Sequence, residues 1–135
     1  MVTPISLADA RVLVVDDDVD AAEALGLILK RRGADVRLAH AVTEALVTLA
    51  GWTAVVVVTD IVMPHEDGYD LLREIRALPG LDSGVPVIAL SAFGGDDIRQ
   101  RALDAGFHSY LRKPVNLREL CQTIALLADA VGQHC

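Results

Sequence analysis

The stretch AVVVVTDIVMPHEDG, residues 54–68, decides the fold. Its four consecutive valines do not alternate with polar residues, which is typical of a strand buried on both faces of a parallel sheet. The run ends in Thr59 and Asp60, and a Met-Pro turn follows at once. A buried strand that delivers a carboxylate at its carboxyl end indicates a sheet whose edge carries chemistry.

Outward from this strand, short apolar runs alternate with segments of helical periodicity. Strands are predicted at 11–15, 35–39, 54–59, 87–90 and 108–111, helices at 19–32, 42–50, 69–78, 96–105 and from 116 onward, and a loop at 79–86. Gly33, Gly51 and Gly106 stand where helices should end, and Asn116 with Glu119 has the spacing of a capping box. This alternation predicts one α/β domain, a (βα)5 doubly wound parallel five-stranded sheet with helices on both faces.

Composition excludes several classes of protein. The 135 residues are 53% hydrophobic with a net charge of −7, which favours a packed domain over a disordered one and argues against non-specific nucleic-acid binding. No apolar run approaches the roughly 20 residues of a membrane span, and no signal peptide is recognisable, so we expect a cytoplasmic protein. Cys121 and Cys135 lack disulfide or metal spacing; Cys121 is expected in the core on a helix face.

Polar residues follow four of the five predicted strands. Asp16 and Asp17 follow the first strand, Asp60 the third, Ser91 the fourth and Lys113 the fifth. Ligands of open parallel sheets bind beyond the carboxyl ends of the strands, where these ends meet. We therefore expect all five groups to lie together at one edge.

Three carboxylates in one pocket require a cation. Two unit charges 4 Å apart repel by roughly 4 kcal/mol at an effective dielectric constant near 20. Carboxylates, with water and a backbone carbonyl, are ligands that suit Mg²⁺. Together with a lysine and a small hydroxyl, such a site suits a phosphoryl group, and the natural covalent product is an aspartyl phosphate.

Five motifs carry a resemblance to a known family. They are VLVVDDD at 12–18, VTDIVMP at 58–64, DG at 67–68, ALSA at 89–92 and YLRKP at 110–114. In this order and on these elements they resemble the receiver domains of response regulators, which act in two-component signalling. The resemblance covers residues 11–131, with 1–10 as an N-terminal extension and 132–135 as a C-terminal tail. It implies the flavodoxin-like strand order 2-1-3-4-5.

The resemblance also implies a role for each residue of the expected site. Asp60 corresponds to the phosphoryl acceptor, and Asp16 and Asp17 to the acid pair that holds Mg²⁺ directly or through water. Val62 corresponds to the residue whose backbone carbonyl reaches the metal. Lys113 corresponds to the lysine of the catalytic set, and the bond to Pro114 would be a cis peptide.

Ser91 and Tyr110 correspond to the switch residues of the family. Ser91 would reach toward the phosphoryl oxygens, and Tyr110 would turn inward when Ser91 is recruited. Two plainer interpretations stay open, in which Ser91 is a turn hydroxyl and Tyr110 an ordinary edge-strand aromatic. The side chains two after the acceptor and two after the switch hydroxyl flank the approach of water in this family; here they are Val62 and Phe93.

The implied function is a phosphoacceptor in a phosphorelay. The phosphoryl group would pass from a phosphohistidine of a histidine kinase, or of a histidine phosphotransfer protein, to the acceptor. The surface of the fourth helix, fifth strand and fifth helix would then be remodelled, and the same face is a candidate surface for a homodimer. No other enzyme activity, nucleic acid or membrane is expected. The motifs resemble receivers of hybrid histidine kinases, so a stand-alone relay protein and a module of a longer chain both stay open.

Three alternative functions are less favoured. A phosphatase of the haloacid-dehalogenase type needs a second acid two residues after the nucleophile, where Val62 stands. A nucleotide-binding enzyme needs a glycine-rich phosphate loop, whereas the loop after the first strand is acidic. A receiver-like module that is never phosphorylated usually lacks the acids or the lysine, and all of them are present here.

The remaining candidate residues have plainer interpretations. Asp18 is either a further metal ligand or the N-cap of the first helix. His65 lies in the loop after the acceptor and is expected to be solvated. The other histidines have no partner at metal-site spacing, so no role is assigned to them: His40, His108 and His134.

Overall fold

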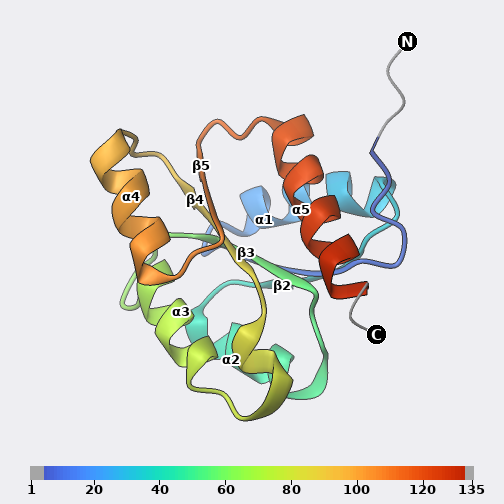
Figure 1. Cartoon of the computed structure of the whole chain (residues 1–135), viewed down its shortest axis with the longest axis horizontal. Helices are drawn as coiled ribbons and strands as arrows, with labels where there is room; N and C mark the ends of the chain where they lie inside the picture. Colours follow the sequence, from blue (N-terminus) through green and yellow to red (C-terminus); the bar gives the residue numbers. More distant parts are fainter. Residues whose placement is uncertain (1–4, 133–135) are drawn as a thin grey trace.

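Strands and helices alternate along the whole of the described chain, as the sequence predicts (Figure 1). The computed structural model describes residues 5–132. Within that range the strands are β1 (Arg11–Val15), β2 (Asp35–Ala39), β3 (Val56–Asp60), β4 (Val87–Ser91) and β5 (Ser109–Arg112). The helices of that range are α1 (Val19–Arg31), α2 (Val42–Gly51), α3 (Gly68–Arg76), α4 (Asp96–Ala105) and α5 (Leu117–Gly132).

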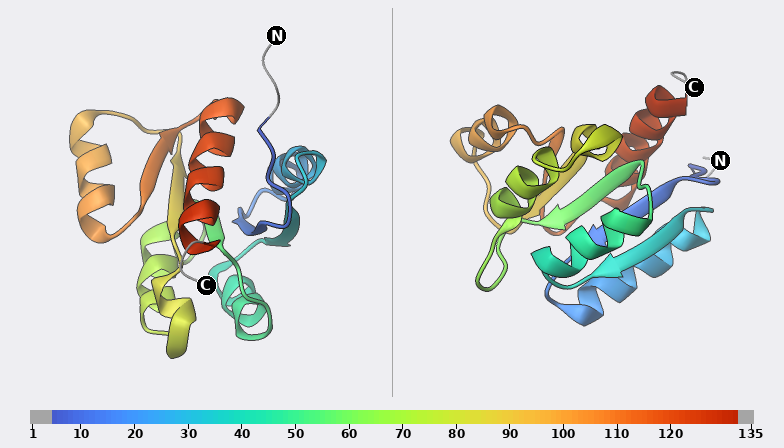
Figure 2. Two further views of the ribbon diagram at one scale, coloured as in Figure 1. Left: turned by 45° about the vertical axis from the view of Figure 1, so that its right-hand side comes forward. Right: turned by 90° about the horizontal axis from the view of Figure 1, so that it is seen from below.

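The strands form one parallel sheet in the order β2-β1-β3-β4-β5, which confirms the expected topology. Helices cover both faces (Figure 2). Alternate residues of the central strands define two cores: Leu13, Val15 and Val57 pack with α2, α3 and α4, whereas Val12 and Val56 pack with α1 and α5. The valine run of β3 is buried on both sides, as its lack of alternation predicts.

Local capping explains where the helices begin and end. Asp18 accepts a hydrogen bond from the Ala21 N–H at 3.1 Å and caps α1, and Asn116 accepts one from the Glu119 N–H at 3.0 Å before α5. Gly106 ends α4 with φ 115°, a left-handed conformation that favours glycine. The interpretation of Asp18 as a helix cap is therefore confirmed.

β1, β2 and α4 have the predicted bounds, whereas the boundaries of the other elements differ from the predicted ones by one or two residues. β3 begins at Val56 and extends to Asp60, while β4 and β5 each end one residue later than expected. α3 ends at Arg76 because Pro79 follows closely and disfavours helical geometry in the preceding residue. Part of the predicted loop is a short 3₁₀ helix, Gly80–Gly84. The Arg76 guanidinium donates to the carbonyls of Ser83 and Val85, both at 2.8 Å, and holds this segment.

The segment before β1 packs onto the same face as α1 and α5. Leu7 is 2% exposed and its N–H donates to the Arg32 carbonyl at 2.7 Å. Cys121 is fully buried on α5, as expected, and burial raises the pKa of its thiol. Cys135 and His134 lie outside the described residues. None of the helices in residues 5–132 combines the length and the apolar character needed to cross a membrane.

Candidate functional site

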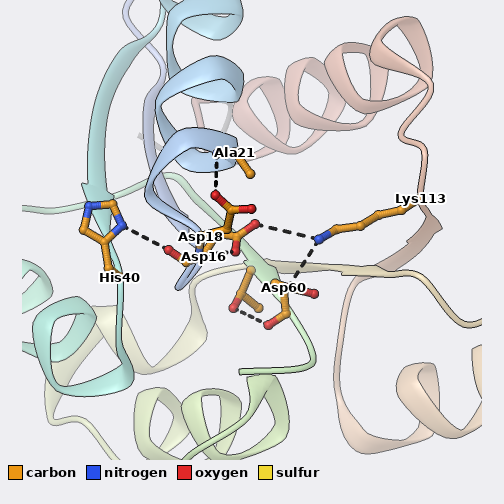
Figure 3. Close-up of polar contacts among 7 residues, drawn as sticks. Asp16, Asp18, Ala21, His40, Asp60 and Lys113 are labelled. Carbon is orange, nitrogen blue, oxygen red and sulfur yellow. Dashed lines mark hydrogen bonds and ion pairs between the residues drawn. The ribbon is translucent and has the colours of Figure 1, made fainter. Parts of the chain in front are cut away.

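The register of the sheet brings the predicted acids together. Val15 of β1 pairs with Thr59 of β3, so Asp16 and Asp60 lie side by side where the two strands end. Carboxylate oxygens of Asp16, Asp17 and Asp60 all lie within 4.8 Å of one another. The three acids converge at the carboxyl edge of the sheet, as the sequence predicts. Figure 3 shows two of them, Asp16 and Asp60, side by side at this edge.

Lys113 reaches the same cluster from the other side. Ser91 of β4 pairs with Arg112 of β5, and the Lys113 N–H donates to the Ser91 carbonyl at 2.7 Å. The Lys113 Nζ lies 3.3 Å from Asp60 Oδ2 and 3.8 Å from Asp16 Oδ2 (Figure 3). The bond between Lys113 and Pro114 is cis. One ammonium group therefore faces two of the three carboxylates.

The cluster contains three carboxylates but only one ammonium group, so a further cation would be attracted to it. Asp16 is only 7% exposed, and burial raises the pKa of its carboxyl group. The hydrogen bond from the Asp18 N–H, at 2.9 Å, and the charge of Lys113 lower this pKa, whereas Asp60 and Asp17 raise it. Burial dominates, so the ionised form of Asp16 is less stable here than in water.

The loop after β3 folds back tightly against the backbone of Asp60. A Cβ at Gly68 would lie 2.9 Å from the Asp60 carbonyl oxygen, so the Asp-Gly motif allows a close approach of backbone to backbone. Met63 is buried and anchors the loop, while Val62 is 55% exposed at the rim. His65 is exposed with φ 68°, consistent with its interpretation as a solvated loop residue.

The two predicted switch residues both contact Phe93. Ser91 is 2% exposed, and its Oγ accepts a hydrogen bond from the Phe93 N–H at 3.1 Å. The Tyr110 hydroxyl donates to the Phe93 carbonyl. Tyr110 is 8% exposed, so its ring already lies inward in this structure. The Phe93 ring itself is 60% exposed, at the rim of the site.

One contact at the site has no counterpart in the sequence-based predictions. His40 Nδ1 lies 3.0 Å from the backbone carbonyl oxygen of Asp16 (Figure 3). Val15 pairs with Ala39, so Asp16 and His40 are the residues that follow two neighbouring strands. The strand order alone places His40 near this loop, because the residue after β2 adjoins the acidic loop after β1.

An acidic pocket with a lysine, at the carboxyl edge of a 2-1-3-4-5 sheet, is the arrangement of a receiver domain. The family model described as the response regulator receiver domain matches residues 12–125. This chain belongs to that family, and it is a receiver domain of two-component signalling.

Two curated relatives show what this chain is similar to. An uncharacterized 14.6 kDa protein of Leptolyngbya boryana is 40% identical over 119 residues, which cover 88% of this chain and 90% of that protein. The response regulator MprA of Mycobacterium tuberculosis is 39% identical over 110 residues, which cover 82% of this chain and 46% of MprA. The chain thus spans about half the length of this second relative.

Solved structures agree with the fold and the family. The receiver domain of the Francisella response regulator 1452 has a TM-score of 0.83 and 31% identity, over 91% of this chain and 99% of that one. A response regulator receiver protein from Pseudomonas putida has a TM-score of 0.79 and 34% identity, over 87% of this chain and 97% of that one.

Proposed function

We propose that this receiver domain accepts a phosphoryl group on Asp60 from a phosphohistidine of a histidine kinase or a histidine phosphotransfer protein. The observation that carries the proposal is the convergence of Asp16, Asp17, Asp60 and Lys113 at one sheet edge. Four charged groups so close together are costly for folding alone, and perturbed ionisable clusters of this kind mark functional sites.

The donor set fits Mg²⁺. The three carboxylates are hard oxygen ligands, and Asp16 is a buried acid whose pKa is raised, so a bound cation would relieve its cost. Asp16, Asp17, Asp60 and the backbone carbonyl of Val62 would hold the ion. When bound, the ion supplies positive charge that offsets the negative charge of the carboxylates and of the phosphoryl oxygens.

The residues of the chain then carry out the transfer. A carboxylate oxygen of Asp60 attacks the phosphorus in line with the histidine nitrogen, so the new O–P bond forms as the P–N bond breaks. The bonding electron pair returns to the imidazole ring of the donor. Lys113, whose Nζ is 3.3 Å from Asp60 Oδ2, would donate to a phosphoryl oxygen and stabilise the charge in the transition state.

The contacts of Phe93 with Ser91 and Tyr110 support a switch at the ends of β4 and β5. A phosphoryl group that recruits the Ser91 hydroxyl would remove it from the Phe93 N–H. The Phe93 carbonyl accepts a hydrogen bond from the Tyr110 hydroxyl. A movement of the Phe93 backbone would therefore pass to Tyr110 on β5 and to the neighbouring α4 and α5. A local change in charge thereby biases a larger element, as phospho-switches generally do.

Intact-mass measurement after incubation with a small phosphodonor and Mg²⁺ tests the proposal. The wild-type chain should gain one phosphate, Asp60→Asn should gain none, and Asp129→Asn, an exposed acid of α5, should behave as wild type. Amide spectra of the phosphorylated sample should shift at residues 92–112. Equal labelling of Asp60→Asn contradicts the assignment, and a wild type that neither labels nor binds Mg²⁺ favours a module that is never phosphorylated.

A further inference from the structure

The end of β2 holds both polar groups of the Asp16 backbone. The Asp16 N–H donates to the Ala39 carbonyl at 3.0 Å, and the Asp16 carbonyl lies 3.0 Å from His40 Nδ1 (Figure 3). The first contact is a continuation of the sheet ladder. The second is made by a side chain 24 residues away in the sequence, so it depends on the identity of His40.

The chemistry of this contact determines the tautomer of His40. A carbonyl oxygen has no hydrogen to donate, so the hydrogen bond forms only when Nδ1 carries the proton. In the neutral ring Nε2 is then the unprotonated nitrogen.

His40 is itself held in place by the start of α2. Its backbone N–H donates to Glu44 Oε2 at 2.7 Å. Ala41, the N-cap residue of α2, has no side-chain cap, so Glu44 reaches back one residue further to His40. The His40 side chain is half-buried between these elements. The hydrogen bond to Glu44 therefore holds the His40 backbone in the position from which its ring reaches the acidic loop.

Fixing the Asp16 carbonyl also fixes the direction in which Asp17 leaves the sheet. The Asp16 carbonyl and the Asp17 N–H belong to one planar peptide unit. Asp16 has a further anchor, because its Oδ1 accepts a hydrogen bond from the Asp18 N–H at 2.9 Å. Asp17 is exposed, and within residues 5–132 its carboxylate has no hydrogen bond or ion pair. The peptide plane is thus the main restraint on where Asp17 points.

We propose that His40 is a positioning residue for the acid pair. By donating from Nδ1 to the Asp16 carbonyl, it holds the peptide that aims Asp17 at Asp60. Without this restraint, repulsion between the carboxylates would favour conformations in which Asp17 turns to solvent. The inference rests on the proposed function, because it concerns how the Mg²⁺ ligands are held. It assigns no contact between His40 and the metal.

A Mg²⁺ titration followed by the backbone amide of Asp60 tests the role in the full chain. His40→Leu removes the donor and should weaken Mg²⁺ binding roughly tenfold, the lower end of what loss of a group that orients a metal ligand usually costs. The Mg²⁺ affinity of His40→Asn should stay within about twofold of that of wild type. The asparagine side-chain amide nitrogen is bonded to Cγ, as Nδ1 of histidine is, so it can donate to the same carbonyl. His108→Asn, at an exposed histidine remote from the acids, is the control.

The route through Asp17 is tested by combining variants. If His40 acts by aiming Asp17, then His40→Leu should have no further effect on Mg²⁺ affinity in an Asp17→Asn background. An additive loss contradicts this route, and so does a His40→Asn variant as weak as His40→Leu. If wild type and His40→Leu bind Mg²⁺ equally well, the role of His40 is wrong while the metal site stands. If wild type binds no Mg²⁺, the proposed function fails instead.

The tautomer supplies a measurement that needs neither metal nor variant. Long-range ¹⁵N–¹H correlation spectra of the wild-type histidine rings, recorded at a pH where His40 is neutral, should give His40 as the Nδ1–H form. An Nε2–H ring at that position would overturn the proposal, even if His40→Leu proved too unstable to titrate.

Discussion

The floor and the rim of the site invert the usual distribution of polar and apolar side chains. Among the residues whose burial the structure describes, 5–80 and 83–129, the buried polar or charged residues are Asp16, Thr59 and Ser91, and all of them lie at the strand ends that form the floor. At the rim Val62 and Phe93 expose 55% and 60% of their surface. Burying a charge and exposing a large apolar group both oppose stability. Their coincidence at one edge indicates a region shaped for chemistry.

Removing charge from the floor is expected to have the largest effect. The double variant Asp16→Asn and Asp17→Asn replaces two anionic ligands by neutral amides, so Mg²⁺ affinity should fall by more than roughly tenfold. The Asp60 amide titration measures this loss. Asp129→Asn is the matched control, since it removes one exposed negative charge of the chain away from the site. A double variant that titrates like wild type would refute the metal site.

The buried Asp16 carboxyl group at the floor should also make the free energy of unfolding depend on pH. Burial raises the pKa of Asp16 above its ordinary value of 3.8, so the native state binds this proton more tightly than the unfolded state. The contribution of Asp16 to stability is therefore most favourable in acid. It is lost as the pH rises through the window between 3.8 and the raised pKa.

Thermal unfolding of Asp16→Asn in EDTA tests this sign. At pH 7 the variant should melt a few degrees higher than wild type, a shift that corresponds to roughly 1 kcal/mol in a domain of this size. The difference should shrink toward zero as the pH falls below 3.8, because Asp16 is then protonated in both the folded and the unfolded chain and is as neutral as the asparagine.

Asp70 supplies the opposite case in the same molecule. The Asp67 N–H and Arg73 lower the pKa of its carboxyl group, so its contribution is present above the ordinary value of 3.8 and is lost as the pH falls through the lowered pKa. Asp70→Asn should therefore melt below wild type at pH 7 and approach it in acid. For Asp16→Asn, a rise in melting temperature that is the same at every pH would count against burial of the Asp16 carboxylate as its cause.

The contrast between these acids also explains what the sequence could predict. The cluster of Asp16, Asp60 and Lys113 was predictable because parallel strands with right-handed crossovers bring their carboxyl ends together whatever the side chains are. The sequence analysis does not predict the capping box formed by Asp67 and Asp70, although its spacing is local, because the third helical position holds aspartate where glutamate or glutamine is usual.

Contacts that depend on register were harder to predict. The bond from His40 to the Asp16 carbonyl requires β2 and β1 to pair with Val15 opposite Ala39, and no periodicity in the sequence reports that pairing. The buried ring of Tyr110 likewise makes a contact between two segments that are far apart in the sequence, since its hydroxyl donates to the Phe93 carbonyl. Elements and strand ends are local properties, whereas side-chain contacts between loops are not.

The rim is expected to control how long a phosphoryl group stays on Asp60, with a smaller effect than the floor. Hydrolysis needs a water molecule in line with the phosphorus, and neither Val62 nor Phe93 can hydrogen-bond to that water. Phe93 is held through both of its backbone polar groups, by Ser91 and Tyr110, so a substitution can change its side chain and keep these contacts. We therefore expect slow self-dephosphorylation.

Polar substitutions at the rim should shorten this lifetime. Val62→Asn and Phe93→Glu each add one group that can orient the water, and a single hydrogen bond of about 1 kcal/mol corresponds to a roughly fivefold faster decay. The measurement is a time course of dephosphorylation after removal of the phosphodonor, with Mg²⁺ held constant. Val47→Asn is the matched control, because Val47 is a valine of α2 that is 75% exposed and has no part in the site. If decay is unchanged or slower in both rim variants, the apolar rim does not protect the phosphoryl group, and the exposure of Val62 and Phe93 has another cause.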